Sequence, residues 1–494
     1  MSAKAELRKH GADAEKALMK EFMQLMDMDV MDPQKADELT AKQKQEALGM
    51  INMIKEKRGH TAEFPDLKGR ACADSRPQRT RYTKEDTASP KVSNDAFMIQ
   101  MMINAIEARD VAFADVAGAY LHAHMTEFVA MRITGEEVNI LCKLNPDWEK
   151  FVTIENGKRV LYVRLNKALY GCVQSALLWY KLFTTTLEGM GFEVNPYDMC
   201  GANAVINGKQ CTVCWYVDDN MINHVDKNVV SETIKQIEDK FGKMTVTRGE
   251  EHDFLGMKIT MSKKYRTTKI NMNESIKEAR SDFLEDIVKN AATPATRYLF
   301  NVMEDSPLLD ETRAENFHSI TQKLLYISRR CRLDIQTALG YLTTRVSCPN
   351  KDDWAKLRRV LQYLRGTMDE CLILGGDSVG SMESWVDAAS GVHNDMKSHT
   401  GGCMSWGLGV LLTMCIKQRL NVKSSTEAEV VGVSNFLPNM IWARMFIEAQ
   451  GYSIDENILH QDNQSAMKIE TNGRMSCGKK SRHIDARYFS SKTD

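Results

Sequence analysis

The sequence has no excess of either charge and no apolar run long enough to cross a membrane. Its 494 residues carry 65 Lys plus Arg against 66 Asp plus Glu, which gives a formal net charge of −1. A globally basic surface is therefore excluded, and any nucleic-acid partner must be held by local basic patches. The longest nearly apolar stretch, 401–416, has 16 residues, whereas a membrane-spanning helix needs ~20. We therefore expect no membrane partner.

The sequence also lacks a secretory signal and a disulfide framework. Residues 1–16 are charged and contain no apolar core. The twelve cysteines are scattered without framework spacing. Both observations predict an intracellular, reducing location, in the cytoplasm or the nucleus, with free thiols. The hydrophobic share of 43% and the charged share of 27% are ordinary for globular proteins and exclude wholesale disorder.

The N-terminal part combines helical patterns with a basic run. Apolar residues recur at helical spacing from Ala17 to Met26, Pro33 interrupts them, and Leu39 to Ile54 forms a second amphipathic run. The segment from Lys68 to Lys84 then holds six basic residues against Asp74 alone. Such a run is either a solvated loop or a phosphate-binding surface, and the sequence leaves both readings open.

The rest of the sequence indicates two mixed α/β regions with a mostly helical region between them. Residues 85–260 alternate strand-like and helical patterns, and residues 275–370 are mostly helical, with a helix stop at Pro349. The Gly- and Ser-rich stretch 375–381 predicts a linker. After it, strand-like runs and the helical pattern 425–450 indicate a second α/β domain. A length of 494 residues at ~150 per domain agrees with about three domains.

Two acidic sites end apolar β runs. Asp218 and Asp219 follow Tyr216 and Val217 at a predicted hairpin turn, where solvent and metal can reach them. Two carboxylates this close repel unless a cation neutralises them. A bare Asp-Asp pair is more often a plain polar turn, but Asp115 ends another apolar strand upstream. If the two strands pair in one sheet, the three acids suit a pair of Mg²⁺ or Mn²⁺ ions.

At this point an ordered set of motifs matches a known family. The matching motifs are Asp115-Val116-x-x-Ala119-Tyr120-Leu121, Lys167-Ala168-Leu169-Tyr170-Gly171-x-x-Gln174 with Trp179-Tyr180, Tyr216-Val217-Asp218-Asp219, and Phe254-Leu255-Gly256. Together they resemble the reverse transcriptase of copia-type LTR retrotransposons. The resemblance extends upstream to Lys68-Gly69-Arg70 and downstream to Tyr363-Leu364-x-Gly366-Thr367, so it covers nearly the whole chain.

The resemblance implies an α/β (α+β) fold, a right-hand polymerase followed by a C-terminally shortened RNase H-like domain. Residues 1–275 would form fingers and palm, 276–375 the thumb or connection region, and 376–494 the RNase H-like domain.

The resemblance also assigns roles within the polymerase. The metal ligands and catalytic centre would be Asp115, Asp218 and Asp219, and the substrate-binding residues Tyr120, Gly171, Lys68, Arg70 and Tyr216. Tyr120 would exclude a 2′-hydroxyl, or would simply be a core aromatic. Gly171 would let the backbone approach the new base pair because it has no Cβ, and Lys68 and Arg70 would contact the triphosphate.

A second set of acids lies beyond the predicted linker. Asp387 sits on a strand, Glu429 near the start of a long helix, and Asp462 at the end of another strand. In the RNase H domain of the resembling family, acids in these contexts would bind two Mg²⁺ ions and hydrolyse the RNA of an RNA–DNA hybrid. Glu427 instead suits the positive end of the helix dipole.

The sequence departs from the family pattern in places. Ala389 and Ser390 stand where the family has an acid and an aromatic residue, and the family's last strand and helix, with a fourth acid, do not follow Arg487. Asp485 is a weak substitute. We therefore expect a fragment or a shortened gene product, with a complete polymerase core and a questionable RNase H centre.

Two functions from different classes remain at this stage. The first is an RNA-directed DNA polymerase whose partners would be an RNA template, a DNA primer, an RNA–DNA hybrid, deoxynucleoside triphosphates and other retrotransposon proteins. The alternative is a catalytically silent nucleic-acid-binding remnant or a co-opted retroelement protein. The basic residues Arg329, Arg330, Arg332, Lys356, Arg358 and Arg359 fit either a duplex channel or ordinary exposed helix faces.

Overall fold

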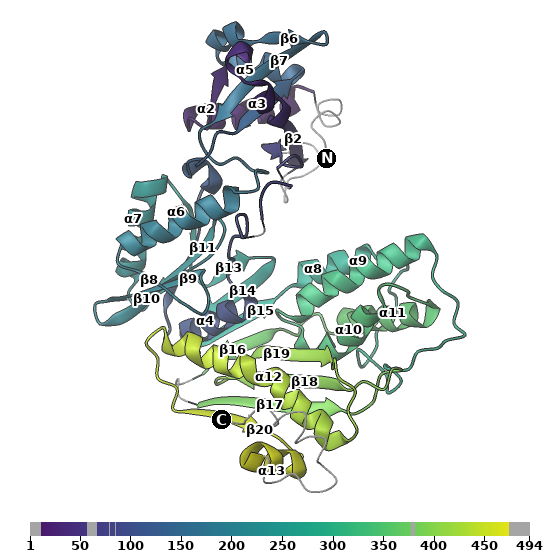
Figure 1. The fold of residues 1–494 in the computed structure, drawn as a ribbon. Helices are drawn as coiled ribbons and strands as arrows, with labels where there is room; N and C mark the ends of the chain where they lie inside the picture. Colours follow the sequence, from purple (N-terminus) through teal and green to yellow (C-terminus); the bar gives the residue numbers. More distant parts are fainter. Residues whose placement is uncertain (1–10, 57–66, 79, 84, 377–380, 474–494) are drawn as a thin grey trace, which may run out of the picture.

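The computed structural model describes residues 11–56, 67–78, 80–83, 85–376 and 381–473 of the chain (Figure 1). These residues form a mixed α/β fold, as the sequence predicts, and they contain four sheets. Its α-helices are α2 (Ala12–Asp27), α3 (Ala41–Glu46), α4 (Asn94–Ile106), α5 (Glu136–Leu144), α6 (Ser175–Gly189), α7 (Lys227–Phe241), α8 (Asn273–Ser281), α9 (Glu311–Ser328), α10 (Gln336–Leu342), α11 (Lys351–Gly366), α12 (Ser425–Glu448) and α13 (Gln464–Asn472). None of the helices in the described ranges is long and apolar enough to span a membrane.

The first sheet forms the upper lobe in Figure 1 and has the order β1-β7-β5-β2-β3, with β6 paired to β7. Its strands are β1 (Met31–Gln34), β2 (Leu48–Glu56), β3 (Leu67–Asp74), β5 (Ala130–Thr134), β6 (Thr153–Glu155) and β7 (Lys158–Leu165). Helix α2 packs against β3, and this lobe has a hydrophobic core of its own that includes Phe22, Met131 and Leu161.

One expectation about this lobe is wrong. The run from Leu39 to Ile54 is not one helix, because α3 ends at Glu46 and β2 follows. Thr40 and Gln43 form a capping box that starts α3, whereas pairing of β2 with β3 and β5 buries Leu48 and Ile54 in the sheet. The basic run, which the sequence left open as a solvated loop or a phosphate-binding surface, begins in β3 and continues into turns after Asp74. Arg79 and Lys84 of that run lie outside the described residues.

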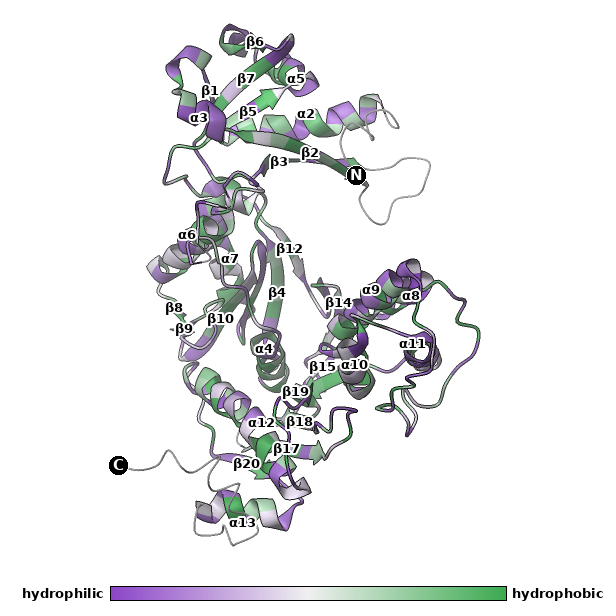
Figure 2. Cartoon of the chain, turned by 45° about the vertical axis from the view of Figure 1, so that its right-hand side comes forward, coloured by the Kyte–Doolittle hydropathy of each residue, from purple (hydrophilic) through white to green (hydrophobic). Residues whose placement is uncertain are grey.

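The second sheet, in the middle of the molecule, has the order β12-β4-β11-β10-β9-β8. Its strands are β4 (Asp110–Asp115), β8 (Glu193–Val194), β9 (Gly201–Ile206), β10 (Lys209–Tyr216), β11 (Asp219–His224) and β12 (Thr245–Arg248). Helix α7 packs on β4 and β11. Helix α4 is hydrophobic on nearly all sides (Figure 2). It is buried between this sheet and the third and fourth sheets.

The third sheet, β13-β14-β15-β16, joins segments that are far apart in the sequence. Its strands are β13 (Glu251–Phe254), β14 (Met257–Ser262), β15 (Thr267–Asn271) and β16 (Leu372–Gly375). Gly375 therefore ends a strand instead of starting a linker. Helices α8 to α11 form the right-hand lobe in Figure 1. Residues 282–310 contain no helix, so the stretch that we expected to be mostly helical is helical only in part.

The fourth sheet, β19-β18-β17-β20, lies at the bottom in Figure 1 with α12 across one face. Its strands are β17 (Ser381–Ala389), β18 (His399–Ser405), β19 (Val410–Lys417) and β20 (Glu456–His460), of which β17 and β20 are parallel. One continuous hydrophobic core runs from the central sheet through the helical lobe into this domain. The C-terminal domain is therefore packed onto the rest of the chain.

Two buried histidines lie where the helical lobe meets the fourth sheet. The rings of His393 and His399 are joined by a 3.1 Å nitrogen contact and both pack against Phe300. Burial is the main cause that lowers the pKa of each to about 4. The charge of Lys417 adds to this effect at His393 while Asp395 opposes it, and His393 adds to it at His399. Because the unfolded pKa is ~6.5, protonation favours the unfolded chain. Stability is full above that pH and falls as the pH drops toward 4.

We expect His393→Gln to flatten the pH dependence of unfolding. Between pH 7.5 and pH 5, the substitution should remove a stability loss on the order of 2 kcal/mol. Urea unfolding at a series of pH values measures this difference. His318→Gln, at an exposed position on α9, is the control and should leave the profile unchanged. Parallel profiles for His393→Gln and the wild type would contradict the prediction.

Candidate functional site

Pairing of β4 with β11 brings the two predicted acidic sites together. Asp219, the first residue of β11, lies directly opposite Asp115, the last residue of β4. Asp218 lies in the two-residue turn between β10 and β11, and its carbonyl accepts a 3.1 Å hydrogen bond from the Val116 amide. All three side chains are half-buried. The structure therefore gathers three carboxylates at one edge of the central sheet.

The turn that contains Asp218 has a strained backbone and is held in place by side-chain hydrogen bonds. Val217 has a φ of +63°, a region that β-branched residues strongly avoid. The Trp179 indole Nε1–H, from α6, donates a 2.7 Å hydrogen bond to the Val217 carbonyl. The Asn220 side-chain amide donates to the Asp218 carbonyl at 2.7 Å and to the Ala114 carbonyl at 3.2 Å. These bonds fix the turn against the end of β4.

The three carboxylates lie near one another at this edge, but their oxygens do not all lie within 4.8 Å of one another, the spacing at which three groups could hold one metal ion. Burial, followed by the charges of Asp218 and Asp115, raises the pKa of Asp219 to about 6. Burial and the charge of Asp218 also raise the pKa of Asp115, while Lys68 and Arg70 act in the opposite direction. Mutual repulsion of this kind is relieved when divalent cations bind between the oxygens. The donor set, all carboxylate oxygens, fits Mg²⁺ or Mn²⁺.

We expect Trp179→Phe to damage the site more than it damages the fold. The substitution leaves the Val217 carbonyl without its donor and should cost about 1–2 kcal/mol of stability. In a primer-extension assay of the polymerase activity that the resemblance implies, the released turn should lower the rate by more than about tenfold, because small displacements of reacting groups are costly. Trp442→Phe is the control, since its indole Nε1–H also donates to a carbonyl, that of Tyr197, far along the chain from the turn. Equal extension rates for the two variants would contradict the prediction.

The residues expected to bind substrate surround this edge. Tyr120 is half-buried in the 3₁₀ turn after β4, and its ring lies 5.0 Å from that of Tyr170. The Arg70 guanidinium stacks 3.9 Å above the Tyr170 ring. Lys68 is exposed on the same strand as Arg70. Arg70 and Lys68 thus face the carboxylates from the upper lobe.

Gly171 packs closely against the backbone of β3, a contact that the sequence does not indicate. A Cβ at this position would lie 2.2 Å from the Ala73 carbonyl oxygen, and φ is +93°. The Ala73 amide donates a 2.7 Å hydrogen bond to the Tyr170 carbonyl. The missing side chain therefore serves close packing of the Tyr170–Gly171 backbone against β3.

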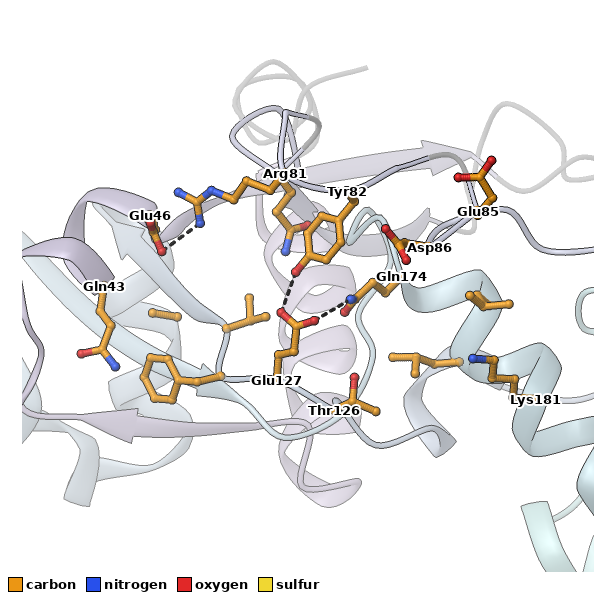
Figure 3. Close-up of a pocket in the computed structure, with 16 residues that line it drawn as sticks. Gln43, Glu46, Arg81, Tyr82, Glu85, Asp86, Thr126, Glu127, Gln174 and Lys181 are labelled. Carbon is orange, nitrogen blue, oxygen red and sulfur yellow. Dashed lines mark hydrogen bonds and ion pairs between the residues drawn. The ribbon is translucent and has the colours of Figure 1, made fainter.

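A cavity of about 660 Å³ between the upper lobe and α6 is not where the carboxylates meet (Figure 3). In it, Glu127 accepts hydrogen bonds from the Tyr82 hydroxyl at 2.9 Å and from the Gln174 side chain at 3.1 Å. Arg81 pairs with Glu46 at 2.8 Å. Four described carboxylates line this cavity, and they disfavour phosphate binding. Its polar contacts instead join the upper lobe to the start of α6.

The second predicted set of acids also meets. Oxygens of Asp387, Glu429 and Asp462 all lie within 4.8 Å of one another. Asp387 comes from β17, Glu429 from the second turn of α12, and Asp462 from the end of β20, which is parallel to β17. Burial raises the pKa of Glu429, whereas a hydrogen bond from the Gln461 side chain (3.3 Å) lowers it. This trio fits a divalent metal by the chemistry of its donors.

Glu427 takes part in capping α12, as the sequence suggests. Its carboxylate accepts a 2.7 Å hydrogen bond from the Lys423 amide, and its own amide donates to the Ser424 hydroxyl at 3.1 Å. A hollow of about 730 Å³ reaches from Asp387 and Asp462 across the open face of the sheet. Asp485, the weak candidate for a fourth acid, lies outside the described residues.

Sequence reasoning missed several contributors to the site. Trp179 and Tyr170 occur in the matched motifs, but nothing in the sequence indicates that one holds the Val217 carbonyl and the other carries Arg70. The Lys91 ammonium lies 5.3 Å from the ring centre of Tyr216, a contact without any sequence signal. Contacts of this kind depend on the tertiary fold.

Comparisons with known proteins agree with this geometry. Residues 41–295 match the family model described as reverse transcriptase (RNA-dependent DNA polymerase). The chain is 25% identical over 443 residues to the retrovirus-related Pol polyprotein from transposon TNT 1-94 of Nicotiana tabacum, covering 88% of this chain and 32% of the relative. It is 26% identical over 417 residues to the corresponding polyprotein from transposon RE2 of Arabidopsis thaliana, covering 82% and 26%. The transposon Ty1-NL2 Gag-Pol polyprotein of Saccharomyces cerevisiae is 23% identical over 292 residues, covering 56% and 16%.

The paired carboxylate turn and the matched residues together define a polymerase-type chain. It belongs to the reverse transcriptase (RNA-dependent DNA polymerase) family. Its relatives are Pol polyproteins of copia-type retrotransposons. The chain spans about a third or less of the length of these relatives.

Proposed function

We propose that the chain is the RNA-directed DNA polymerase of a copia-type retrotransposon and carries a second centre that cleaves the RNA of RNA–DNA hybrids. The register that sets Asp115 opposite Asp219, beside Asp218, is the observation that carries this proposal. The family match supports it and does not favour a catalytically silent remnant.

In this proposal the lobes form a right-hand polymerase. The β1–β7 lobe acts as fingers, the central sheet as palm, α8–α11 as thumb or connection, and β17–α13 as an RNase H-like domain. Residues 1–275, 276–375 and 376–494 remain the proposed domain ranges. The two metal-binding centres, one in the palm and one in the last domain, lie on separate sheets.

Each group of residues has a proposed task. Asp115, Asp218 and Asp219 hold the metal ions in the palm, and Asp387, Glu429 and Asp462 hold them in the last domain. Bound Mg²⁺ or Mn²⁺ would activate the attacking oxygen and stabilise the charge of the transferring phosphate. Arg70, kept in place by stacking on Tyr170, and Lys68 neutralise the triphosphate of the incoming nucleotide. Tyr120 packs beneath its sugar, and Tyr216 supports the primer end.

The proposed partners follow from this chemistry. They are an RNA template, a DNA primer, the RNA–DNA hybrid, deoxynucleoside triphosphates and other retrotransposon proteins. We propose an intracellular location, in the cytoplasm or the nucleus. The eleven cysteines in the described ranges are all unpaired.

Primer extension tests the polymerase directly. The purified chain is given an RNA template with a DNA primer, deoxynucleotides and Mg²⁺ or Mn²⁺. Asp115→Asn, which removes one carboxylate charge and keeps the size of the side chain, is the matched variant. We expect extension by the wild-type chain and none by the variant. Folded wild-type protein that binds the primer–template without extending it would overturn the proposal.

A further inference from the structure

The structure separates the six basic residues of the helical region by what they contact. Arg332 is buried against Asp334 at 2.7 Å, Lys356 pairs with Asp352 at 2.9 Å, and Arg358 pairs with Glu285 at 3.1 Å. These cations are used in holding the fold together. Arg359 donates to the Thr293 hydroxyl at 2.9 Å, and Arg329 lies near enough to Asp95 to oppose the rise that burial causes in the pKa of that carboxyl. Arg330, like Arg359, has no ion pair in the described ranges and a buried Nε without a hydrogen-bond partner, but it differs from all of them in lying near Tyr216 and the carboxylate turn.

Arg330 is half-buried and has no ion pair with any residue in the described ranges. Its Nη1 reaches only the Tyr326 carbonyl, at 3.2 Å in its own helical turn, and its buried Nε has no hydrogen-bond partner. Burial lowers the pKa of this guanidinium. A desolvated cation without a counter-charge is costly to a folded protein. A bound anion would offset that cost.

The position of Arg330 is fixed relative to the palm. Its guanidinium stacks 3.5 Å from the ring centre of Tyr326, and the Tyr326 hydroxyl donates a 2.8 Å hydrogen bond to the Leu255 carbonyl at the β13–β14 turn. The neighbouring Phe254 packs on Phe113 with ring centroids 5.2 Å apart. Phe113 lies on β4, two residues before Asp115. A chain of packed side chains thus connects Arg330 to the catalytic strand.

Arg330 also lies close to the carboxylate turn. Tyr216, which precedes Val217 and Asp218, is near enough to influence the pKa of Arg330. Lys91 approaches the ring of the same tyrosine. Arg330 belongs to the lobe of α9, whereas Lys68 and Arg70 belong to β3 in the upper lobe, with β4 between them (Figure 2). Cations therefore approach the carboxylates from two different lobes.

We propose that Arg330 binds a phosphodiester of the primer strand near its 3′ end. The inference rests on the proposed polymerase function and adds that the primer strand, rather than the template, lies on the α9 side of the carboxylates. Nucleotidyl transfer joins two anionic reactants, a primer and a triphosphate, at the metal-binding edge. Lys68 and Arg70 serve the triphosphate, so the cation on the other lobe is left for the primer. Guanidinium groups bind phosphate with short, charge-assisted hydrogen bonds.

Binding of labelled primer–template without deoxynucleotides tests this inference apart from catalysis. We expect Arg330→Gln to weaken binding about tenfold and to reduce the salt dependence of log K by about one. Arg329→Gln removes the same charge one residue away, at an exposed position near Asp95, and should leave both values near wild type. Equal effects of the two variants would overturn the inference, because net charge alone would explain them.

Neutral methylphosphonate linkages identify the strand. They are placed one at a time near the primer 3′ end, or at facing positions of the template. For one primer linkage, the affinity loss seen with the wild-type chain should vanish with Arg330→Gln. Arg330→Lys keeps the charge and should recover part of the affinity; it carries the test if Arg330→Gln does not fold. Coupling to a template linkage, or to none, would overturn the inference.

The two proposals can fail separately. A wild-type chain that binds primer–template but does not extend it would overturn the polymerase, while the methylphosphonate test would still decide the role of Arg330. A wild-type chain that extends primers with no coupling at Arg330 would overturn only this inference. A wild-type chain that does not bind primer–template would overturn both.

Discussion

Asp218→Asn is expected to abolish primer extension while hybrid cleavage continues, and Glu429→Gln is expected to do the reverse. Each substitution removes one negative charge from a trio of carboxylates and keeps the side-chain size. Metal affinity and transition-state stabilisation at that centre should fall together, with a rate loss of at least ~10³-fold. The centres lie on different sheets, so neither loss should spread to the other. Extension and cleavage of the same labelled hybrid measure both reactions.

Matched controls separate loss of a ligand from loss of a charge. Asp239→Asn removes a carboxylate from an exposed position of α7 and should leave extension intact. Glu427→Gln lies two residues before Glu429 and disturbs the start of α12, so it should lower the melting temperature but keep cleavage. If Glu427→Gln abolished cleavage as completely as Glu429→Gln, the assignment of Glu429 to the metal would be wrong. If Asp218→Asn stopped both reactions, the two centres would not be independent.

Much of the active-site region could be predicted because its signals are local. An acid that follows an apolar run marks a strand end, and two such runs lead to Asp115 and to the pair Asp218 and Asp219. Two further hairpins have an equally local sequence signal. Asn207-Gly208 joins β9 to β10 with both residues at positive φ, which is the strongest short-range turn signal in a sequence. Asn156-Gly157 joins β6 to β7 in the same way.

The errors came from segments whose structure is set by distant partners. Residues 48–56 have a helix-like spacing of apolar residues, yet they form β2 because β3 and β5 offer them backbone partners. Gly375 reads as a linker but pairs, within β16, with Thr267 of β15, about a hundred residues earlier. Propensity is a weak prior where sheet pairing decides. Arg330 shows the same limit, since only the fold places it near Tyr216 and the carboxylate turn.

Gly171→Ala should destabilise the chain by about 2–5 kcal/mol, through steric conflict as well as backbone strain. An alanine here must adopt a φ of +93° and place its Cβ 2.2 Å from the Ala73 carbonyl oxygen. Left-handed backbone costs about 1–2 kcal/mol, and forcing atoms into packed space adds about 1–3 kcal/mol. Gly157→Ala is the control, because its φ of +73° is also left-handed but nothing lies within 4 Å of the added Cβ.

The difference between the two glycine variants isolates the contact with β3. Gly157→Ala should lose only the backbone term, about 1–2 kcal/mol in urea unfolding, and should extend primers normally. Gly171→Ala must push β3 away from the Tyr170–Gly171 backbone, and β3 carries Arg70 above the Tyr170 ring. Any folded fraction of this variant should therefore bind deoxynucleoside triphosphates more weakly, which appears as a raised KM. Equal stability losses in the two variants would mean that β3 moves away from the added Cβ at little cost in free energy. A KM of Gly171→Ala equal to that of the wild type would show that Arg70 does not contribute to nucleotide binding.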